Sequence, residues 1–136
     1  MQELIIAIKS TRNKAPGPTS IGIIQIKHLP KNCKQIILNI YNGILCTKYY
    51  QIILRNINMI FIDKHHKNPS NPLNYRPICL IETLLKLFEK ILTQRLQYFL
   101  EYHNILSEKQ FGFRQNKSTN QAITLIFQAI DAHIKN

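Results

Sequence analysis

The hydrophobic pattern of the chain changes its period near residue 82. Residues 78–81 form a continuous apolar run, which is typical of a short buried strand. From Glu82 onward the apolar residues recur three and four positions apart, at Leu84, Leu85, Phe88, Ile91, Leu92, Leu96 and Phe99. This spacing predicts an amphipathic helix of about five turns over Glu82–His103. The pattern therefore predicts a strand that leads directly into a long helix.

A second strand is expected at residues 57–62 (INMIFI), which are rich in β-branched side chains and bounded by polar residues. We predict that it pairs antiparallel with the 78–81 strand across a long basic loop, residues 63–74. Arg76 precedes Pro77, and a residue before proline is biased away from the helical region. Arg76 should therefore lie on extended backbone.

Helical spacing also recurs on both sides of this hairpin. The remaining helices are predicted at residues 2–10, 21–29 and 34–46, and in a last segment that Ser118 or Thr119 caps. The apolar face of the last helix carries Ile123, Ile126, Phe127, Ile130 and Ile134. Residues 49–54 are ambiguous between helix and strand. The predicted class is α+β, helix-rich with one small antiparallel sheet.

Composition narrows the class of function. The net charge of +11 points to a polyanionic partner, either a nucleic acid or a membrane surface, and the 45% apolar share favours a folded chain. No apolar run approaches the ~20 residues of a membrane span, and the N-terminus lacks the pattern of a secretory signal. Three cysteines without metal-site spacing suit a reducing compartment, so we expect an intracellular protein.

Four ordered motifs carry a family resemblance. They are NKAPGPTSI at 13–21, NYRPICL at 74–80, KLFEKIL at 86–92 and QFGFRQNKST at 110–119. In this order the chain resembles the front part of the reverse transcriptase domain of non-LTR (LINE-type) retrotransposons, over nearly its whole length. The resemblance implies that residues 1–136 form a partial reverse transcriptase domain, the fingers and the start of the palm.

The resemblance also implies partners and a metal. Enzymes of this family copy RNA into DNA from deoxynucleoside triphosphates (dNTPs) with Mg²⁺. The expected partners are therefore an RNA template, an RNA/DNA duplex and a dNTP, together with the palm and thumb if another chain supplies them. No membrane partner is expected.

The resemblance assigns Lys64 and Arg76, at the two ends of the hairpin loop, to the triphosphate of the incoming nucleotide. A lysine point charge and a forked guanidinium suit phosphate oxygens. The family usually has proline before this lysine, whereas Asp63 stands there in this chain and would offset part of the lysine charge. The alternative is a solvated charged turn without a ligand.

The QFGFR motif lies near the template and the nucleotide pocket in the resembled family. We expect Gln110, Gly112 and Arg114 to contact nucleotide or nucleic acid, with Gly112 allowing close backbone approach or a positive φ. Phe111 and Phe113 are either core residues or surfaces for base stacking, and neither is assigned to the site.

Further nucleic-acid contacts are expected from loop cations: Arg12, Lys14, Lys67 and Lys117. In the family the first of these loops ends in Pro-Asp-Gly, where this chain has Thr19 and Ser20 after Pro18. The alternative for this loop is a rigid basic connector, because two prolines flank Gly17.

The chain has too few aspartates for a polymerase metal site. Template-directed nucleotide addition uses two divalent ions held by clustered carboxylates, but the only aspartates here are Asp63 and Asp131. The cysteines and the His65-His66 pair also lack metal-ligand spacing, so we predict no metal site and no catalytic residue. The resemblance implies truncation at both ends, so the chain alone should not polymerise DNA.

Two other hypotheses remain open. The chain is either a non-catalytic basic module that binds nucleic acid in a salt-sensitive way, or a piece that folds poorly because an apolar face has no partner.

Overall fold

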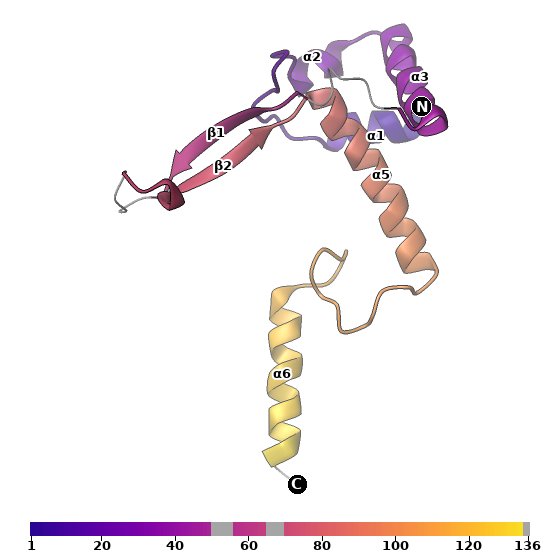
Figure 1. Cartoon of the computed structure of the whole chain (residues 1–136). Coiled ribbons are helices and arrows are strands. Elements are labelled where there is room, and N and C mark those ends of the chain that lie inside the picture. The colour runs from indigo at the N-terminus through magenta and orange to yellow at the C-terminus, as the bar shows by residue number, and fades with distance from the viewer. Residues whose placement is uncertain (50–55, 65–69, 135–136) are drawn as a thin grey trace. The chain divides into compact units, whose positions relative to one another are not determined.

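The computed structural model describes residues 1–49, 56–64 and 70–134, and its α+β class is the one expected (Figure 1). The elements are α1 (Gln2–Ser10), α2 (Ile23–His28), α3 (Lys31–Thr47), β1 (Asn58–Asp63), the 3₁₀ turn η1 (Pro72–Asn74), β2 (Tyr75–Leu80), α5 (Thr83–Tyr102) and α6 (Thr119–Ile134). The chain divides into two compact units, residues 1–92 and 93–136, and each is described by itself.

A small helical core fills the first unit. α1, α2, α3 and the first turns of α5 supply its buried side chains: Leu4, Ala7, Ile8, Ile23, Ile26, Ile37, Tyr41, Ile44, Leu87, Phe88 and Ile91. The rings of Tyr41 and Phe88 lie 5.0 Å apart between centroids. The Tyr41 hydroxyl also donates to the backbone oxygen of Leu84 at 2.6 Å, so its polar end is satisfied inside the core.

The loop between α1 and α2 is bonded to the start of α5. Glu82 is only 4% exposed, and its carboxylate accepts from both the backbone N–H (2.8 Å) and the hydroxyl (2.6 Å) of Thr19. One residue further, the Thr83 hydroxyl donates to the backbone oxygen of Ile21 at 2.6 Å. We name these contacts of Thr19 and Ile21 with Glu82 and Thr83 the loop clamp. The clamp ties this loop to the start of α5.

Two backbone positions allow the loop to come this close. A Cβ on Gly17 would lie 2.7 Å from the backbone N of Glu82 and from the carbonyl group of Ile81, so no larger residue fits there. Ser20 has a φ of 60°, in the left-handed region that glycine favours. Ser20 thus adopts a conformation that a glycine would adopt without strain.

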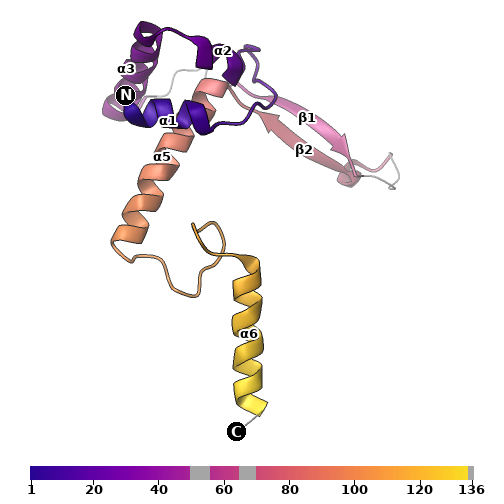
Figure 2. The same cartoon turned by 180° about the vertical axis from the view of Figure 1, so that it is seen from behind.

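β1 and β2 form an antiparallel hairpin in which Asn58 faces Leu80 and Asp63 faces Tyr75. The expectation of a buried strand at residues 78–81 is wrong: β2 begins and ends earlier, and its Ile78 is 41% exposed. Among the described residues of the first unit, α1, α2 and α3 lie at the base of this ribbon and leave its faces exposed (Figures 1 and 2). An apolar run predicts a strand, but it does not specify what packs on it.

The predicted helix ends are close to those observed. The third helix begins three residues before the predicted position 34, directly after Pro30, whose fixed φ suits a helix start. The helix predicted at 21–29 is shorter in the structure. It starts after Gly22, whose N–H donates to the Gln25 side chain at 3.0 Å and caps the first turn of α2. The ambiguous segment 49–54 falls almost wholly outside the described residues.

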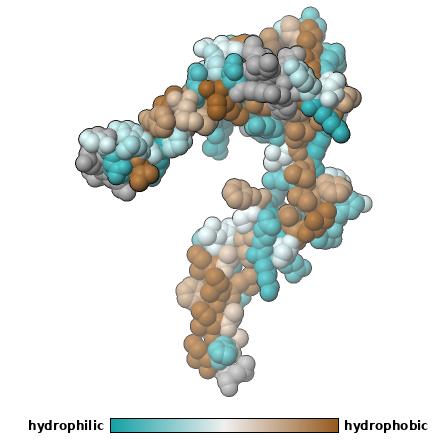
Figure 3. Space-filling view, in the orientation of Figure 1, coloured by the Kyte–Doolittle hydropathy of each residue, from teal (hydrophilic) through white to brown (hydrophobic). Residues whose placement is uncertain are grey.

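The second unit holds the last turns of α5, an irregular loop and α6. Ser118 caps α6 as predicted: its hydroxyl accepts from the Gln121 N–H at 3.3 Å, and its own N–H donates to the Gln121 side chain at 2.8 Å. The apolar stripe of α6 is exposed, and brown atoms run along this helix in Figure 3. In the described ranges, no helix is long and apolar enough to cross a membrane.

Gly17→Ala should lower the free energy of unfolding by about 1–3 kcal/mol, because its methyl group overlaps the backbone of Ile81 and Glu82. Gly43→Ala is the matched control: the site lies inside α3, nothing approaches within 4 Å, and the helix should gain about 0.5–1 kcal/mol. Urea unfolding of both variants measures this. Equal stability of the two would contradict the close approach at Gly17.

Glu82→Ala should lower the free energy of unfolding by about 1–3 kcal/mol, because it removes the buried carboxylate that accepts both the N–H and the hydroxyl of Thr19. Glu89→Ala removes the same group from an exposed position of α5 and should change stability by less than about 0.5 kcal/mol. If both variants unfold at the same urea concentration, the clamp does not hold the loop.

Candidate nucleotide and nucleic-acid site

The distal end of the hairpin holds the two cations assigned to a triphosphate. Ile62 faces Arg76 in the strand register, and the Lys64 N–H donates to the backbone oxygen of Asn74 at 2.8 Å, which continues the pairing by one step. Side chains alternate between the faces of a strand pair, so Lys64 and Arg76 lie on the same face as diagonal neighbours. Arg76 lies inside a strand, which confirms its expected extended backbone.

These two cations differ in their surroundings. The Lys64 ammonium donates to the backbone oxygen of Leu73 at 2.7 Å, and its residue is half-buried. The Arg76 guanidinium is exposed and has no hydrogen-bond acceptor among the residues that the structure describes. Arg76 is therefore free to bind an anion, whereas Lys64 must exchange a backbone contact to do so.

The other predicted cations are spread over separate segments. Arg12 and Lys14 are exposed on the α1–α2 loop of the first unit. Lys67 falls outside the described residues. Lys117 belongs to the second unit, where its ammonium lies 5.3 Å from the centre of the Phe111 ring, a cation–π distance. The structure thus brings Lys64 and Arg76 together but does not join Arg12 and Lys14 to them.

Arg114 organises the loop of the second unit. Its Nε and Nη2 donate to the two carboxylate oxygens of Glu101 at 2.9 and 2.7 Å, and its Nη1 donates to the Ser107 backbone oxygen at 2.8 Å. The Arg114 side chain is only 13% exposed, against 40% for Glu101. The hydrogen bonds from Arg114 lower the pKa of Glu101 below its ordinary value of 4.5, and Glu101 in turn raises the pKa of Arg114.

Gly112 differs from its expected conformation. It has no positive φ, and nothing lies within 4 Å of where its Cβ would be, so neither reason for a glycine applies here. The left-handed residue is its neighbour Phe113, with a φ of 59°. Gln110 donates from its side-chain amide to the Gly112 backbone oxygen at 3.4 Å and keeps the segment turned.

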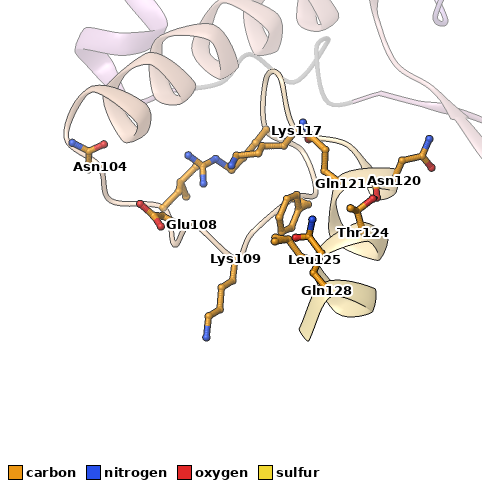
Figure 4. A pocket seen from close by; sticks show the side chains of 12 residues that line it. Asn104, Glu108, Lys109, Lys117, Asn120, Gln121, Thr124, Leu125 and Gln128 are labelled. Atoms are coloured by element: carbon orange, nitrogen blue, oxygen red, sulfur yellow. The ribbon is translucent and has the colours of Figure 1, made fainter. Parts of the chain in front are cut away.

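A hollow of about 930 Å³ opens between this loop and the first turns of α6 (Figure 4). Asn104 and Glu108 line it from the loop, and Asn120 and Thr124 line it from α6. Lys117 and Lys109 add two positive charges to this lining against the single acid Glu108, whereas the charge of Arg114 is offset by Glu101. A hollow of this size with basic and amide side chains can hold an anionic ligand with hydrogen-bonding groups.

Sequence reasoning missed the α6 side of this hollow. The missed residues share a helical spacing of four, which a search for polar stripes would have found: Asn120, Thr124 and Gln128.

Comparison with known proteins bears on these residues directly. The reverse transcriptase (RNA-dependent DNA polymerase) family profile matches residues 62–136, which include both hairpin cations and the QFGFR motif. The chain belongs to the reverse transcriptase family. Together with the mobile-element relatives given next, this match confirms the motif-based resemblance to non-LTR retrotransposon enzymes.

Curated relatives of this reverse transcriptase chain come from mobile elements of flies. The probable RNA-directed DNA polymerase from transposon BS of Drosophila melanogaster is 33% identical over 90% of this chain. The corresponding protein from transposon X-element is 32% identical over 92%, and that from mobile element jockey is 29% identical over 81%. The chain spans 14% of the length of the first two proteins and 12% of the third.

The described residues do not fit a catalytic metal. Across residues 1–49, 56–64 and 70–134, no three His, Cys, Asp or Glu side chains gather closely enough to hold an ion. Hard divalent ions need such clusters of oxygen ligands. No step of nucleotide addition is therefore assigned to residues of this reverse transcriptase chain.

The Glu101–Arg114 pair gives a pH dependence with a defined sign. The pKa of Glu101 is lower in the folded protein than in the unfolded chain. The contribution of the ion pair to folding stability is therefore complete above the ordinary value of 4.5, and it is lost as the pH falls through the lowered pKa. In a pH titration followed by NMR, the Arg114 Nε–H signal should shift with a midpoint below 4.5.

Glu101→Gln should abolish this titration, whereas Glu108→Gln should leave its midpoint in place, since Glu108 does not bond to Arg114. A midpoint at or above 4.5 in the unaltered protein would show that the pair does not form in solution.

Proposed function

We propose that this chain forms the fingers and the start of the palm of an RNA-directed DNA polymerase, and that it grips the incoming dNTP and the template there. The observation that carries the proposal is the shared face of Lys64 and Arg76 at the free end of the hairpin. Arg76 offers its whole guanidinium to a ligand, because it has no acceptor among the described residues.

The chemistry of a triphosphate suits this pair. The guanidinium presents parallel N–H groups that match two phosphate oxygens, and the lysine adds a mobile point charge beside it. The ammonium of Lys64 leaves one neutral carbonyl, that of Leu73, to bind the anion. That exchange favours the ligand, because hydrogen bonds to charged groups are stronger than those to neutral ones.

The proposal also covers the metal, the partners and the site of action of the whole protein. The Mg²⁺ of nucleotide addition, the RNA/DNA duplex, the palm and thumb, and an intracellular site of action are all part of it. Support for the template comes from the net charge of +11, which favours a polyanion.

A second candidate is a basic module that binds nucleic acid without taking part in catalysis. The same net charge favours it, because Lys and Arg bind phosphates of any sequence and release counterions. In a basic module all exposed cations contribute equally to binding, whereas the first candidate gives Lys64 and Arg76 a specific role in dNTP binding. Removing these two cations therefore distinguishes the two functions.

The double variant Lys64→Ala/Arg76→Ala should weaken binding of a dNTP by about 10- to 100-fold, because it removes two charge-assisted contacts. It should weaken binding of single-stranded RNA only a few-fold. Equilibrium dialysis with dTTP and with an RNA oligomer measures both affinities.

The matched control is Lys27→Ala/Lys31→Ala, which removes two exposed cations of the helical body. It should leave dTTP affinity unchanged. If both double variants lose dTTP and RNA affinity to the same degree, the basic module is the correct function.

A further inference from the structure

Phe113 is the most exposed large apolar residue of the second unit. Its side chain is 99% exposed, and its backbone holds a φ of 59°, which is costly for a bulky residue. Full exposure and a strained backbone both disfavour this arrangement in water. Strain of this kind persists where the surroundings impose it, and it marks candidate functional positions.

The surroundings of Phe113 do impose it. Arg114, the next residue, is fixed by its two bonds to Glu101 and one to Ser107. The backbone oxygen of Phe113 accepts from the Gln97 side chain of α5 at 3.5 Å. The ring is therefore presented by a constrained loop, with the charge of Arg114 neutralised by Glu101.

A second hollow, of about 280 Å³, lies beside this ring within the second unit. Phe113 and Tyr98, which is 70% exposed, are its aromatic residues. Side-chain amides form much of the remaining lining: Gln94, Gln97 and Gln115. The hollow shares Leu106 and Arg114 with the larger basic hollow, so the two adjoin each other.

We propose that this second hollow binds an unpaired nucleobase, with Phe113 as the stacking surface. Every base has a flat face that stacks on an aromatic ring. Glutamine amides carry both donors and acceptors, which match the edges of bases. The hollow is too small for a whole drug-sized ligand but suits a single ring system.

The neighbouring hollow explains where the phosphates of such a strand go. Lys117 and Lys109 line it, and it shares Arg114 with the aromatic hollow. A nucleotide in the aromatic hollow would therefore have cations on one side for its backbone. An apolar protein segment suits the site less well, because it would cover the amides of Gln94 and Gln115 without offering them a hydrogen-bond partner.

The proposal rests on the proposed contact with a nucleic-acid strand, and it extends that contact to a residue outside the sequence-predicted site. The chain has no tryptophan, so Phe113→Trp creates a single fluorescent reporter at the stacking position. Phe127→Trp is the matched control, since Phe127 is also exposed (63%) but lies on α6 outside the hollow.

The first measurement is fluorescence on titration with an oligouridine strand and with an abasic strand of the same length. We expect the strand with bases to quench the Phe113→Trp reporter and the abasic strand to leave it unchanged, while the Phe127→Trp reporter responds to neither. A parallel titration with free uridine monophosphate separates a base on a strand from a free nucleotide, because a strand site prefers the oligomer.

The second measurement is affinity. Phe113→Ala should weaken oligouridine binding by about 5- to 150-fold, the range found for loss of one stacked base, and should leave abasic binding unchanged. Equal affinity of the unaltered protein for both strands would overturn the nucleobase site while leaving the proposed nucleic-acid contact intact. Failure to bind either strand would overturn both.

Discussion

The rest of the first unit depends on the loop clamp at the start of α5. A carboxylate that is almost fully buried is costly unless its oxygens are hydrogen-bonded, and both oxygens of Glu82 accept from Thr19. Only two residues separate the end of β2 from the start of α5, and Glu82 is one of them. The clamp therefore fixes the point at which the hairpin leaves the helical core, and with it the direction in which Lys64 and Arg76 can be presented.

The clamp also bears on the two positions of this loop, Thr19 and Ser20, at which the chain departs from the family pattern. Thr19 stands where the family typically has aspartate, and an aspartate there would face the carboxylate of Glu82 and repel it. Ser20 stands where the family has glycine and accepts a left-handed backbone at some cost. A threonine opposite a glutamate is thus a consistent pair, and the loop keeps its position with different residues.

Sequence periodicity predicted most of the fold, because amphipathic helices and a strand pair are local patterns. It identified α1, α2, α3, α5 and α6 to within a few residues, and it identified the hairpin pairing. It failed where a long-range partner decides the outcome. Ile78 has the character of a core residue but is 41% exposed, and Leu87 is fully buried although it was absent from the predicted apolar stripe. The site shows the same division: strand alternation places Lys64 beside Arg76, but only the fold reveals that Glu101 engages Arg114.

The engagement of Arg114 changes how the QFGFR motif acts. A guanidinium with three short bonds to Glu101 and Ser107 has little capacity left for a phosphate, so its main effect is to hold the loop. Phe113, an apolar residue of the kind usually found in a core, is instead the exposed residue of this motif. Charge attracts a strand from a distance, whereas a stacked ring distinguishes a base from bare phosphate. The motif therefore combines an internal ion pair, which sets the geometry, with an aromatic surface that makes the contact.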